Sequence, residues 1–468
     1  MPTTLLRTKL YIPPVRPELV PRPRLVERLR AGLDRRLTLI SAPAGFGKTT
    51  LLSQCIAHCD PRTRVAWLSL DQGDNDPARF WMYVVAALQT MQPELGESTV
   101  AKLQTAQPQP VESLLTGLLN EIAAAGIERF VLVLDDFHLI TESQIYKGLT
   151  FLLDNLPPPP GGMHLIISSR ADLPWPIARL RARGELTELR PADLRFTLEE
   201  VTSFLNDVVG LGLSPENVVA LDARTEGWIA GLQMAAISMR ERRQSQGAHG
   251  LSVFIQTLTA SHRFILDYLV EEVLDQQSEE VQAFLLQTAI LNRLTGSLCD
   301  ALTGREDGRQ TLEYLERANL LLVPLDDQRQ WYRYHHLFAD ALQSRLKAQQ
   351  PNQVADLHLR ASEWYQQEDL FPDAIRHALA AQDFERVADL AELIWPDWNE
   401  GYRPLRWLRW VNNLPEELIR KRPVLCVATA QAFLYAGQLE AAEARLLDAE
   451  RNARFLGRRF VRWSGAAA

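Results

Sequence analysis

A short apolar stretch that runs into a glycine-rich loop constrains this chain more than any other feature. Residues 37–41 are Leu-Thr-Leu-Ile-Ser, and the loop after them ends in Gly-Lys-Thr, with alanine where such loops usually begin with glycine. Glycines let successive backbone N–H groups turn inward, and the start of a helix aims them at an anion. We therefore predict a phosphate-binding loop of Ala42, Pro43, Ala44, Gly45, Phe46, Gly47, Lys48, Thr49 and Thr50.

The end of this loop predicts which ligand it holds. The ammonium group of Lys48 would reach the β- and γ-phosphates of a nucleotide, and the Thr49 hydroxyl is placed to ligate Mg²⁺. Six of the 50 cationic residues are lysine, so a chance cation at this position would more often be arginine. The expected ligands are therefore ATP or ADP with Mg²⁺.

Two adjacent carboxylates follow another apolar run. Residues 130–134 are Phe-Val-Leu-Val-Leu, which is typical of a buried parallel strand, and Asp135 and Asp136 come directly after them. At the carboxyl edge of a parallel sheet, the first carboxylate can hold Mg²⁺ through water and the second can polarise an attacking water. We assign the metal role to Asp135 and the base role to Asp136, with two surface aspartates as the alternative.

Composition limits the class of protein. A chain of 468 residues is too long for a single hydrophobic core and is expected to form three or four domains. Its 46% apolar content is typical of a soluble globular protein. The net charge of −8 leaves no electrostatic footprint for nucleic acid over the chain as a whole. Neither a secretory leader nor a membrane-spanning apolar stretch is recognisable, so we expect no membrane association and a cytoplasmic protein.

The four cysteines form no Cys-x-x-Cys pair, which argues against a disulfide framework and a zinc ribbon. Cys55, His58 and Cys59 share one side of a predicted helix. Packing behind the phosphate loop is the favoured interpretation, and a metal site is the alternative.

The order of elements predicts an α/β P-loop NTPase core with a parallel sheet over residues 37–192, after a proline-containing lead-in over 1–36. Strand patterns alternate with helical ones, which favours parallel strands joined by right-handed helical crossovers. The predicted strands are 37–41, 65–70, 130–134, 164–168 and 186–189.

Helical periodicity prevails beyond this core. We predict a helical domain over 193–277, opened by a capping box of Thr197 and Glu200, and a winged-helix-like domain over 278–348 with a hairpin of 320–324 and 331–334. Residues 349–468 predict an incomplete α-solenoid of TPR-like repeats spaced roughly 34 residues apart. In that part, Trp407, Trp410 and Leu414 are expected to form one apolar helical face, and stacking on nucleic-acid bases is the alternative.

Several motifs in this order resemble one family. They are Ile166–Arg170 (Ile-Ile-Ser-Ser-Arg), Arg195-Phe-Thr, Glu226-Gly-Trp-Ile-Ala-Gly-Leu and Tyr334-His-His-Leu-Phe. From about residue 5 to 455 the chain resembles the N-terminal part of MalT-like transcriptional activators, the large LuxR-type regulators among the signal-transduction (STAND) ATPases with numerous domains.

The resemblance implies further site residues. Arg170, at the end of the fourth strand, would sense the γ-phosphate, or it caps a strand at the surface. His335 would touch the β-phosphate of ADP and hold a closed state, or it is a core histidine. Val20 and Arg22 fall where the family grips adenine, although Pro21 replaces the glycine of that motif.

Other residues of the resembling motifs have less specific roles. Gly227 and Gly231 would lie where the helical domain approaches the nucleotide, and Trp228 is a candidate core residue.

The resemblance also implies partners and an output. The family continues through a superhelical sensor domain to a DNA-binding helix-turn-helix, whereas this sequence stops after a short basic tail with Arg458, Arg459 and Arg462. We expect either a truncated or frameshifted gene product or a protein that works without DNA of its own. DNA would be contacted only through a domain absent from this chain, and the site of the unknown inducer would lie largely in the missing part.

The expected function is therefore a nucleotide switch. Mg·ATP would bind between the α/β core and the winged helix and shift a closed, ADP-bound monomer toward an open, self-associating form, with slow ATP hydrolysis as the reset. Turnover is expected to be slow because no arginine finger can be assigned. The alternatives are a non-catalytic nucleotide-binding partner that modulates the assembly of full-length regulators, and an AAA-like motor acting on nucleic acid or protein.

Overall fold

The computed structural model describes residues 5–15, 18–103, 110–125, 129–157, 163–240, 255, 263–400 and 404–453. The chain divides into two compact units. The first unit contains Met1–Ser278, Glu313–Pro324 and Tyr334–Ala341, and the second contains Glu279–Leu312, Leu325–Arg333 and Leu342–Ala468. Among the described residues, no helix combines the length and apolar character needed to span a membrane.

A five-stranded parallel sheet forms the centre of the first unit, with the strand order β2-β3-β4-β1-β5. The strands are β1 Leu37–Ser41, β2 Thr63–Ser69, β3 Arg129–Asp135, β4 Met163–Ser169 and β5 Leu186–Leu189. Because β1 and β4 are buried along their whole length, and β3 along all but its first residue, these strands suit the interior of an α/β fold. The predicted α/β P-loop core is confirmed, and each predicted strand matches an observed one to within two residues.

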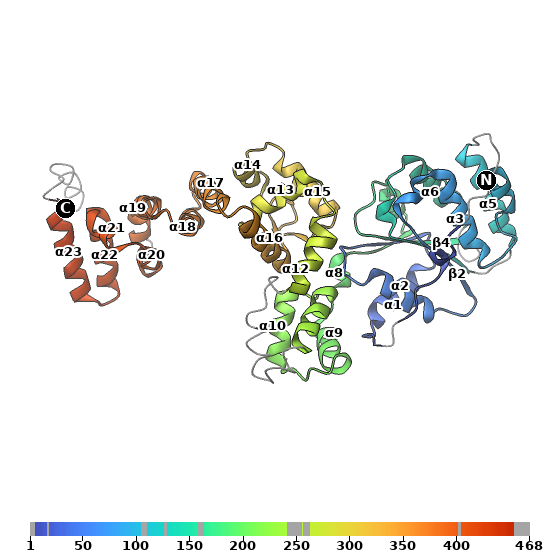
Figure 1. The fold of residues 1–468 in the computed structure, drawn as a ribbon, viewed down its shortest axis with the longest axis horizontal. Helices are drawn as coiled ribbons and strands as arrows, with labels where there is room; N and C mark the ends of the chain where they lie inside the picture. Colours follow the sequence, from blue (N-terminus) through green and yellow to red (C-terminus); the bar gives the residue numbers. More distant parts are fainter. Residues whose placement is uncertain are drawn as a thin grey trace. The chain divides into compact units, whose positions relative to one another are not determined.

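Helices cover both faces of this sheet. In Figure 1, α1 and α2 lie on one face, and α3, α5 and α6 lie on the other. Their bounds are α1 Pro23–Gly32, α2 Lys48–Ala57, α3 Pro77–Gln89, α4 Glu97–Leu103, α5 Val111–Ala124, α6 Ser143–Asn155 and α7 Ala178–Ala182, with the short helices η1 Arg7–Leu10, η2 Gln72–Asn75 and η3 Phe137–Leu139.

A helical part follows the sheet within the first unit. Thr197 caps its second helix as predicted, since its hydroxyl accepts a hydrogen bond from the Glu200 amide and the Glu200 carboxylate accepts one from the Thr197 amide. The helices are α8 Pro191–Leu194, α9 Leu198–Thr202, η4 Ser203–Val208, α10 Pro215–Thr225, a helix over 229–240, α12 Arg263–Leu269 and η5 Val270–Leu274.

The remaining elements include the predicted hairpin and the predicted solenoid. β6 Leu322–Pro324 and β7 Tyr332–Tyr334 form the second sheet, which has two strands. Along the chain, α13 Glu279–Thr288, α14 Gly296–Thr303 and α15 Gly308–Arg317 precede β6, and α16 His336–Gln349 follows β7.

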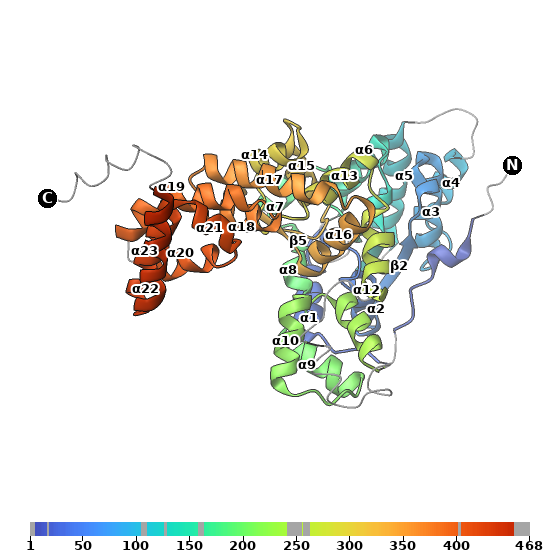
Figure 2. The same ribbon diagram turned by 60° about the vertical axis from the view of Figure 1, so that its left-hand side comes forward.

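Helices of the second unit continue to residue 453 (Figure 2). They are α17 Gln353–Gln367, α18 Phe371–Ala380, α19 Phe384–Glu400, α20 Pro404–Val411, α21 Glu416–Lys421, α22 Pro423–Tyr435 and α23 Leu439–Ala453. α17 packs against α18 and α22 against α23, so the part predicted as a solenoid consists of packed helices. The Trp407 side chain is fully buried and donates to the Ala391 carbonyl at 3.0 Å, as expected of a packing residue. The arginines of the basic tail lie outside the described residues.

Candidate functional site

The loop between β1 and α2 has the backbone of an anion cradle. Gly45 and Gly47 have φ values of 76° and 74°, a left-handed conformation that glycine adopts without strain, and α2 begins at Lys48. The free N–H groups of the first turn of α2 therefore face the concave side of the loop. A side chain at Gly45 would not fit, because a Cβ atom there would lie 2.5 Å from the Cβ of Ala230.

Lys48 is a buried cation in this loop. Its Nζ donates to the carbonyl oxygens of Ala42 and Pro43 at 2.8 and 3.0 Å. Burial lowers the pKa of Lys48 to about 8, with the Arg170 charge acting in the same direction and those of Asp136 and Asp135 opposing it. The group stays mostly protonated at pH 7, as a positive charge that is poorly solvated and would gain from a phosphate partner.

Thr49 and Asp135 meet across the end of the sheet. The Thr49 Oγ1 donates to the Asp135 Oδ2 at 2.9 Å. Burial and the neighbouring Asp136 raise the pKa of Asp135, and its Oδ1 atom is buried with no hydrogen-bond partner among the described residues. A hydroxyl beside a carboxylate with a spare oxygen fits Mg²⁺, a cation that takes few protein ligands and completes its shell with water and phosphate.

Metal binding by protein groups alone finds no support in the described part of the chain. Nowhere in it do three or more His, Cys, Asp or Glu side chains gather in a way that could hold a metal ion. The sequence alternative of a site at Cys55, His58 and Cys59 therefore gains nothing from the structure, and His58 contacts the Gln54 carbonyl of its own helix through Nδ1.

Asp136 follows Asp135 in a left-handed conformation, with φ of 57°. Its carboxylate is partly exposed and lies 3.9 Å from the Nδ1 atom of His138. Burial lowers the pKa of His138 to about 4, with contributions from Arg170 and Lys48. His138 is thus a neutral imidazole beside the proposed base, and sequence reasoning missed it because no motif position marks it.

Arg170 lies directly after β4, next to the loop strand. Its Nη1 pairs with the Glu272 Oε2 at 3.1 Å, and its positive charge lowers the pKa of both Lys48 and His138. The structure therefore brings Arg170, Lys48, Asp135 and Asp136 to one edge of the sheet.

Trp228 and Ala230 attach the helical part to the phosphate loop. The Trp228 indole is fully buried and donates to the Ala44 carbonyl at 3.1 Å, while the Ala230 amide donates to the Gly45 carbonyl at 3.1 Å. Trp228 is a core residue as expected, and it also contacts the loop. Gly231 permits this packing, because a Cβ atom there would lie 2.5 Å from the Trp228 ring.

His335 lies behind Trp228. The two ring centroids are 5.8 Å apart, and the His335 Nε2 contacts the Thr225 carbonyl at 3.0 Å. Burial lowers the pKa of His335 to about 4, and its Nδ1 has no hydrogen-bond partner among the described residues. The structure thus places a neutral His335 against the Trp228 ring, which in turn contacts the phosphate loop.

The Arg22 side chain fastens the N-terminal lead-in to residues 194–197, which we call the linker after the sheet. Its Nη2 donates to the carbonyls of Leu194 and Arg195 at 2.7 and 2.9 Å and lies 3.2 Å from the Glu200 carboxylate. Burial lowers the pKa of Arg22. Val20, two residues earlier, is also buried. These contacts involve the linker, and none of them reaches the phosphate loop.

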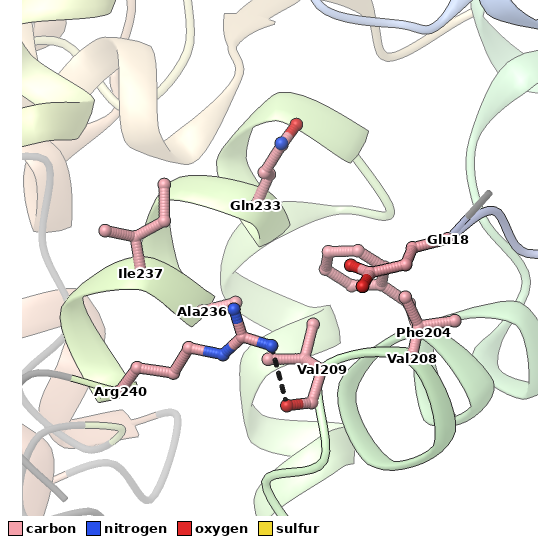
Figure 3. Close-up of a pocket in the computed structure, with 8 residues that line it drawn as sticks. All are labelled: Glu18, Phe204, Val208, Val209, Gln233, Ala236, Ile237 and Arg240. Carbon is pink, nitrogen blue, oxygen red and sulfur yellow. Dashed lines mark hydrogen bonds between the residues drawn. The ribbon is translucent and has the colours of Figure 1, made fainter. Parts of the chain in front are cut away.

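A separate cavity of about 280 Å³ lies in the helical part (Figure 3). Arg240 at its wall donates to the Val209 carbonyl at 3.0 Å. No residue of the phosphate loop lines it; the wall consists of Glu18, Phe204, Val208, Val209, Gln233, Ala236, Ile237 and Arg240.

Comparison with known proteins agrees with this geometry. Residues 19–167 match the family described as AAA ATPase domain, and residues 270–354 match the MalT winged helix domain. The chain is 37% identical over 348 residues to the serine/threonine-protein kinase PknK of Mycobacterium tuberculosis (strain ATCC 25618 / H37Rv), a match that covers 74% of this chain and 30% of that protein.

A second relative is the HTH-type transcriptional regulator MalT of Cronobacter sakazakii, 35% identical over 360 residues that cover 77% of this chain and 39% of the regulator. The match thus spans about a third of the length of these relatives. Among solved structures, the Walker-type ATPase of Pyrococcus abyssi aligns with 70% of this chain and 98% of its own, with a TM-score of 0.47 and 16% identity. The family matches show an AAA ATPase domain over residues 19–167, followed by a MalT winged helix domain over residues 270–354.

Proposed function

We propose that this chain is an ATP-dependent switch of a MalT-like transcription regulator. The contact between Thr49 and Asp135 carries the proposal, because a phosphate loop joined at 2.9 Å to a buried carboxylate with a spare oxygen suits Mg·ATP. Slow hydrolysis to ADP and phosphate would reset the switch.

Each group at the sheet edge has a role in this proposal. Lys48 and the loop amides would hold the β- and γ-phosphates, and Thr49 with Asp135 would hold Mg²⁺, which would supply positive charge against the phosphate oxygens. Asp136 would orient a water and accept its proton while the water oxygen bonds to the γ-phosphorus and the bond to the β-phosphate oxygen breaks, which releases ADP and phosphate. Arg170 would sense the charge of the γ-phosphate. The lead-in with Val20 and Arg22 would border the adenine. The Arg22 side chain would hold the lead-in in place through the Leu194 and Arg195 carbonyls.

The step from nucleotide to output would pass through Trp228 and His335. We propose that ADP favours a closed form and ATP an open, self-associating one, since a ligand shifts an equilibrium only through different contacts in its two states. An inducer would act on the same equilibrium. Control of transcription is proposed here by analogy to the MalT relatives, of which this chain matches part.

Calorimetry with Mg·ATP and Mg·ADP, followed by single-turnover hydrolysis, tests the proposal. We expect the wild type to bind both nucleotides, Lys48→Ala to bind neither, and Asp136→Asn to bind ATP but cleave it more slowly. Absence of nucleotide binding by the wild type, or equal hydrolysis in the two variants, would refute it.

One observation favours a second candidate, a non-catalytic partner of full-length regulators. Large apolar side chains are exposed on α22 and α23, among them Leu434, Tyr435, Leu439, Leu446 and Leu447. Exposed apolar groups gathered on one pair of helices are typical of interaction surfaces. Capture of a full-length MalT-like regulator that is equally strong for wild type and Asp136→Asn would support this candidate over the switch.

A further inference from the structure

A short turn joins α10 to the helix over 229–240, and its backbone is unusual. Glu226 and Gly227 have φ values of 50° and 66°. The left-handed conformation is strained for a residue with a side chain, so it persists where surrounding contacts hold it. Glu226 adopts it in the interior, with 8% of its side chain exposed.

Contacts on one side fasten this turn to the phosphate loop and to the linker. Trp228 and Ala230, directly after the turn, hydrogen-bond to the Ala44 and Gly45 carbonyls as described. The Gly227 carbonyl accepts from the Phe196 amide at 2.9 Å.

Contacts on the other side fasten the same turn to residues 334–341. The Glu226 Oε1 lies 3.2 Å from the Nδ1 of His336 and accepts from the His336 backbone amide at 3.3 Å. Its Oε2 lies 3.2 Å from the Arg195 Nη2. One carboxylate thus ties together the turn, the linker and the start of α16.

We infer that Glu226 is a positioning residue that transmits the nucleotide state of the phosphate loop to residues 334–341. A movement of the Ala44 and Gly45 carbonyls reaches the turn through Trp228 and Ala230. Because contacts on both sides hold the turn, this movement shifts the Glu226 carboxylate and shortens or lengthens its contacts with His336. This inference rests on the proposed switch function and names the residue through which it would act.

Hydrogen exchange of the full chain, followed by mass spectrometry with Mg·ADP or Mg·ATP bound, tests the inference. In the wild type we expect peptides over 334–341 to exchange at different rates in the two nucleotides. Glu226→Gln keeps the shape of the side chain and removes its charge, so we expect the difference over 334–341 to be lost while the loop peptides over 42–50 remain protected by either nucleotide.

Two further variants keep the test decisive. His336→Gln removes the partner instead of the carboxylate, and its side chain is 54% exposed, so folding should tolerate the change. Glu416→Gln is the matched control, because Glu416 also bridges two cations, Arg420 and Arg445, within the second unit. We expect His336→Gln to act like Glu226→Gln and the control to act like the wild type.

The outcomes separate the inference from the proposed function. A wild type that binds nucleotide and whose difference over 334–341 survives in both Glu226→Gln and His336→Gln overturns the inference and leaves the switch intact. A wild type with bound nucleotide and no such difference also overturns it. A wild type that binds no nucleotide overturns both.

Discussion

The indole of Trp228 and the main-chain oxygen of Ala44 form a hydrogen bond that spans 184 positions of sequence. The donor belongs to the helical part and the acceptor to the phosphate loop. Because both groups are buried, breaking this hydrogen bond is costly. The conformation of the phosphate loop and the packing of the helical part are therefore coupled.

Trp228→Phe keeps an aromatic ring and removes the donor. We expect a loss of about 1–3 kcal/mol in the free energy of unfolding, because the Ala44 carbonyl is left buried without its partner, together with weaker nucleotide binding. Trp407→Phe is the control, since it removes a matched bond to the Ala391 carbonyl. Guanidinium denaturation and calorimetry should show that both variants lose stability and that only Trp228→Phe loses affinity.

Lys48→Ala removes the buried ammonium group from the loop. Hydrogen bonds to charged groups contribute about 1.5–3 kcal/mol each, roughly a 10- to 100-fold loss of affinity per bond, so the loss of contacts to both phosphates should reduce binding below detection. Lys147→Ala, on the exposed side of α6, is the control with the same change of charge. Titration calorimetry with Mg·ATP checks the prediction, and similar affinities for the two variants would contradict it.

Gly45→Ala tests the packing of the loop against Ala230. Both Gly45 and Gly184 have left-handed backbones, but a Cβ atom at Gly184 meets no atom within 4 Å. Gly184→Ala should therefore cost about 1–2 kcal/mol from backbone strain alone. Gly45→Ala should cost about 1–3 kcal/mol more from overpacking, measured as the difference in unfolding free energy.

Asp135→Asn separates stability from metal binding. Because the folded state raises the pKa of Asp135, its charge opposes folding above the pKa of the unfolded chain, and that penalty fades as the pH falls. We therefore expect the nucleotide-free variant to be at least as stable at pH 7 as the wild type. Its ATP affinity should respond less to added Mg²⁺, as followed by calorimetry with and without a chelator.

A pair of histidines, one buried and one half-buried, predicts how stability depends on pH. The Nδ1 atoms of His358 and His377 lie 2.8 Å apart, and His377 stacks on Tyr365 beside the Arg376 guanidinium. Burial is the largest cause that lowers the pKa values to about 4 and about 3, and the Arg376 charge acts in the same direction.

Since these folded-state pKa values lie below the usual 6.5, protons bind the unfolded chain first as the pH falls. Stability is fully present above about pH 6.5 and decreases below it, by up to about 1.4 kcal/mol per pH unit for each imidazole. Urea unfolding between pH 7 and 5 should show a shallower decrease for His377→Gln than for the wild type. His58→Gln, on the exposed end of α2, should keep the wild-type slope.

Local patterns were enough to predict the strands and the pairing of the loop with Asp135. Apolar stretches such as residues 130–134 mark the strands, and parallel topology brings the carboxyl ends of β1 and β3 to one edge, so Thr49 and Asp135 had to lie close. Trp228 was identifiable as core but not as a partner of Ala44, because that contact depends on how two distant segments pack. The same reason hid the contacts of Arg22 with the Leu194 and Arg195 carbonyls, whereas His138 was missed because no motif position marks it.

The path of the chain through the first unit has a practical consequence. Residues 313–324 and 334–341 return to it after an excursion, and the Asn319 side chain donates to the Ser41 hydroxyl at the end of β1. An expression fragment that ends at Ser278 would therefore lose Asn319 and its hydrogen bond to Ser41 at the carboxyl end of β1. Fragments designed for crystallisation or ligand screening should run through at least Ala341.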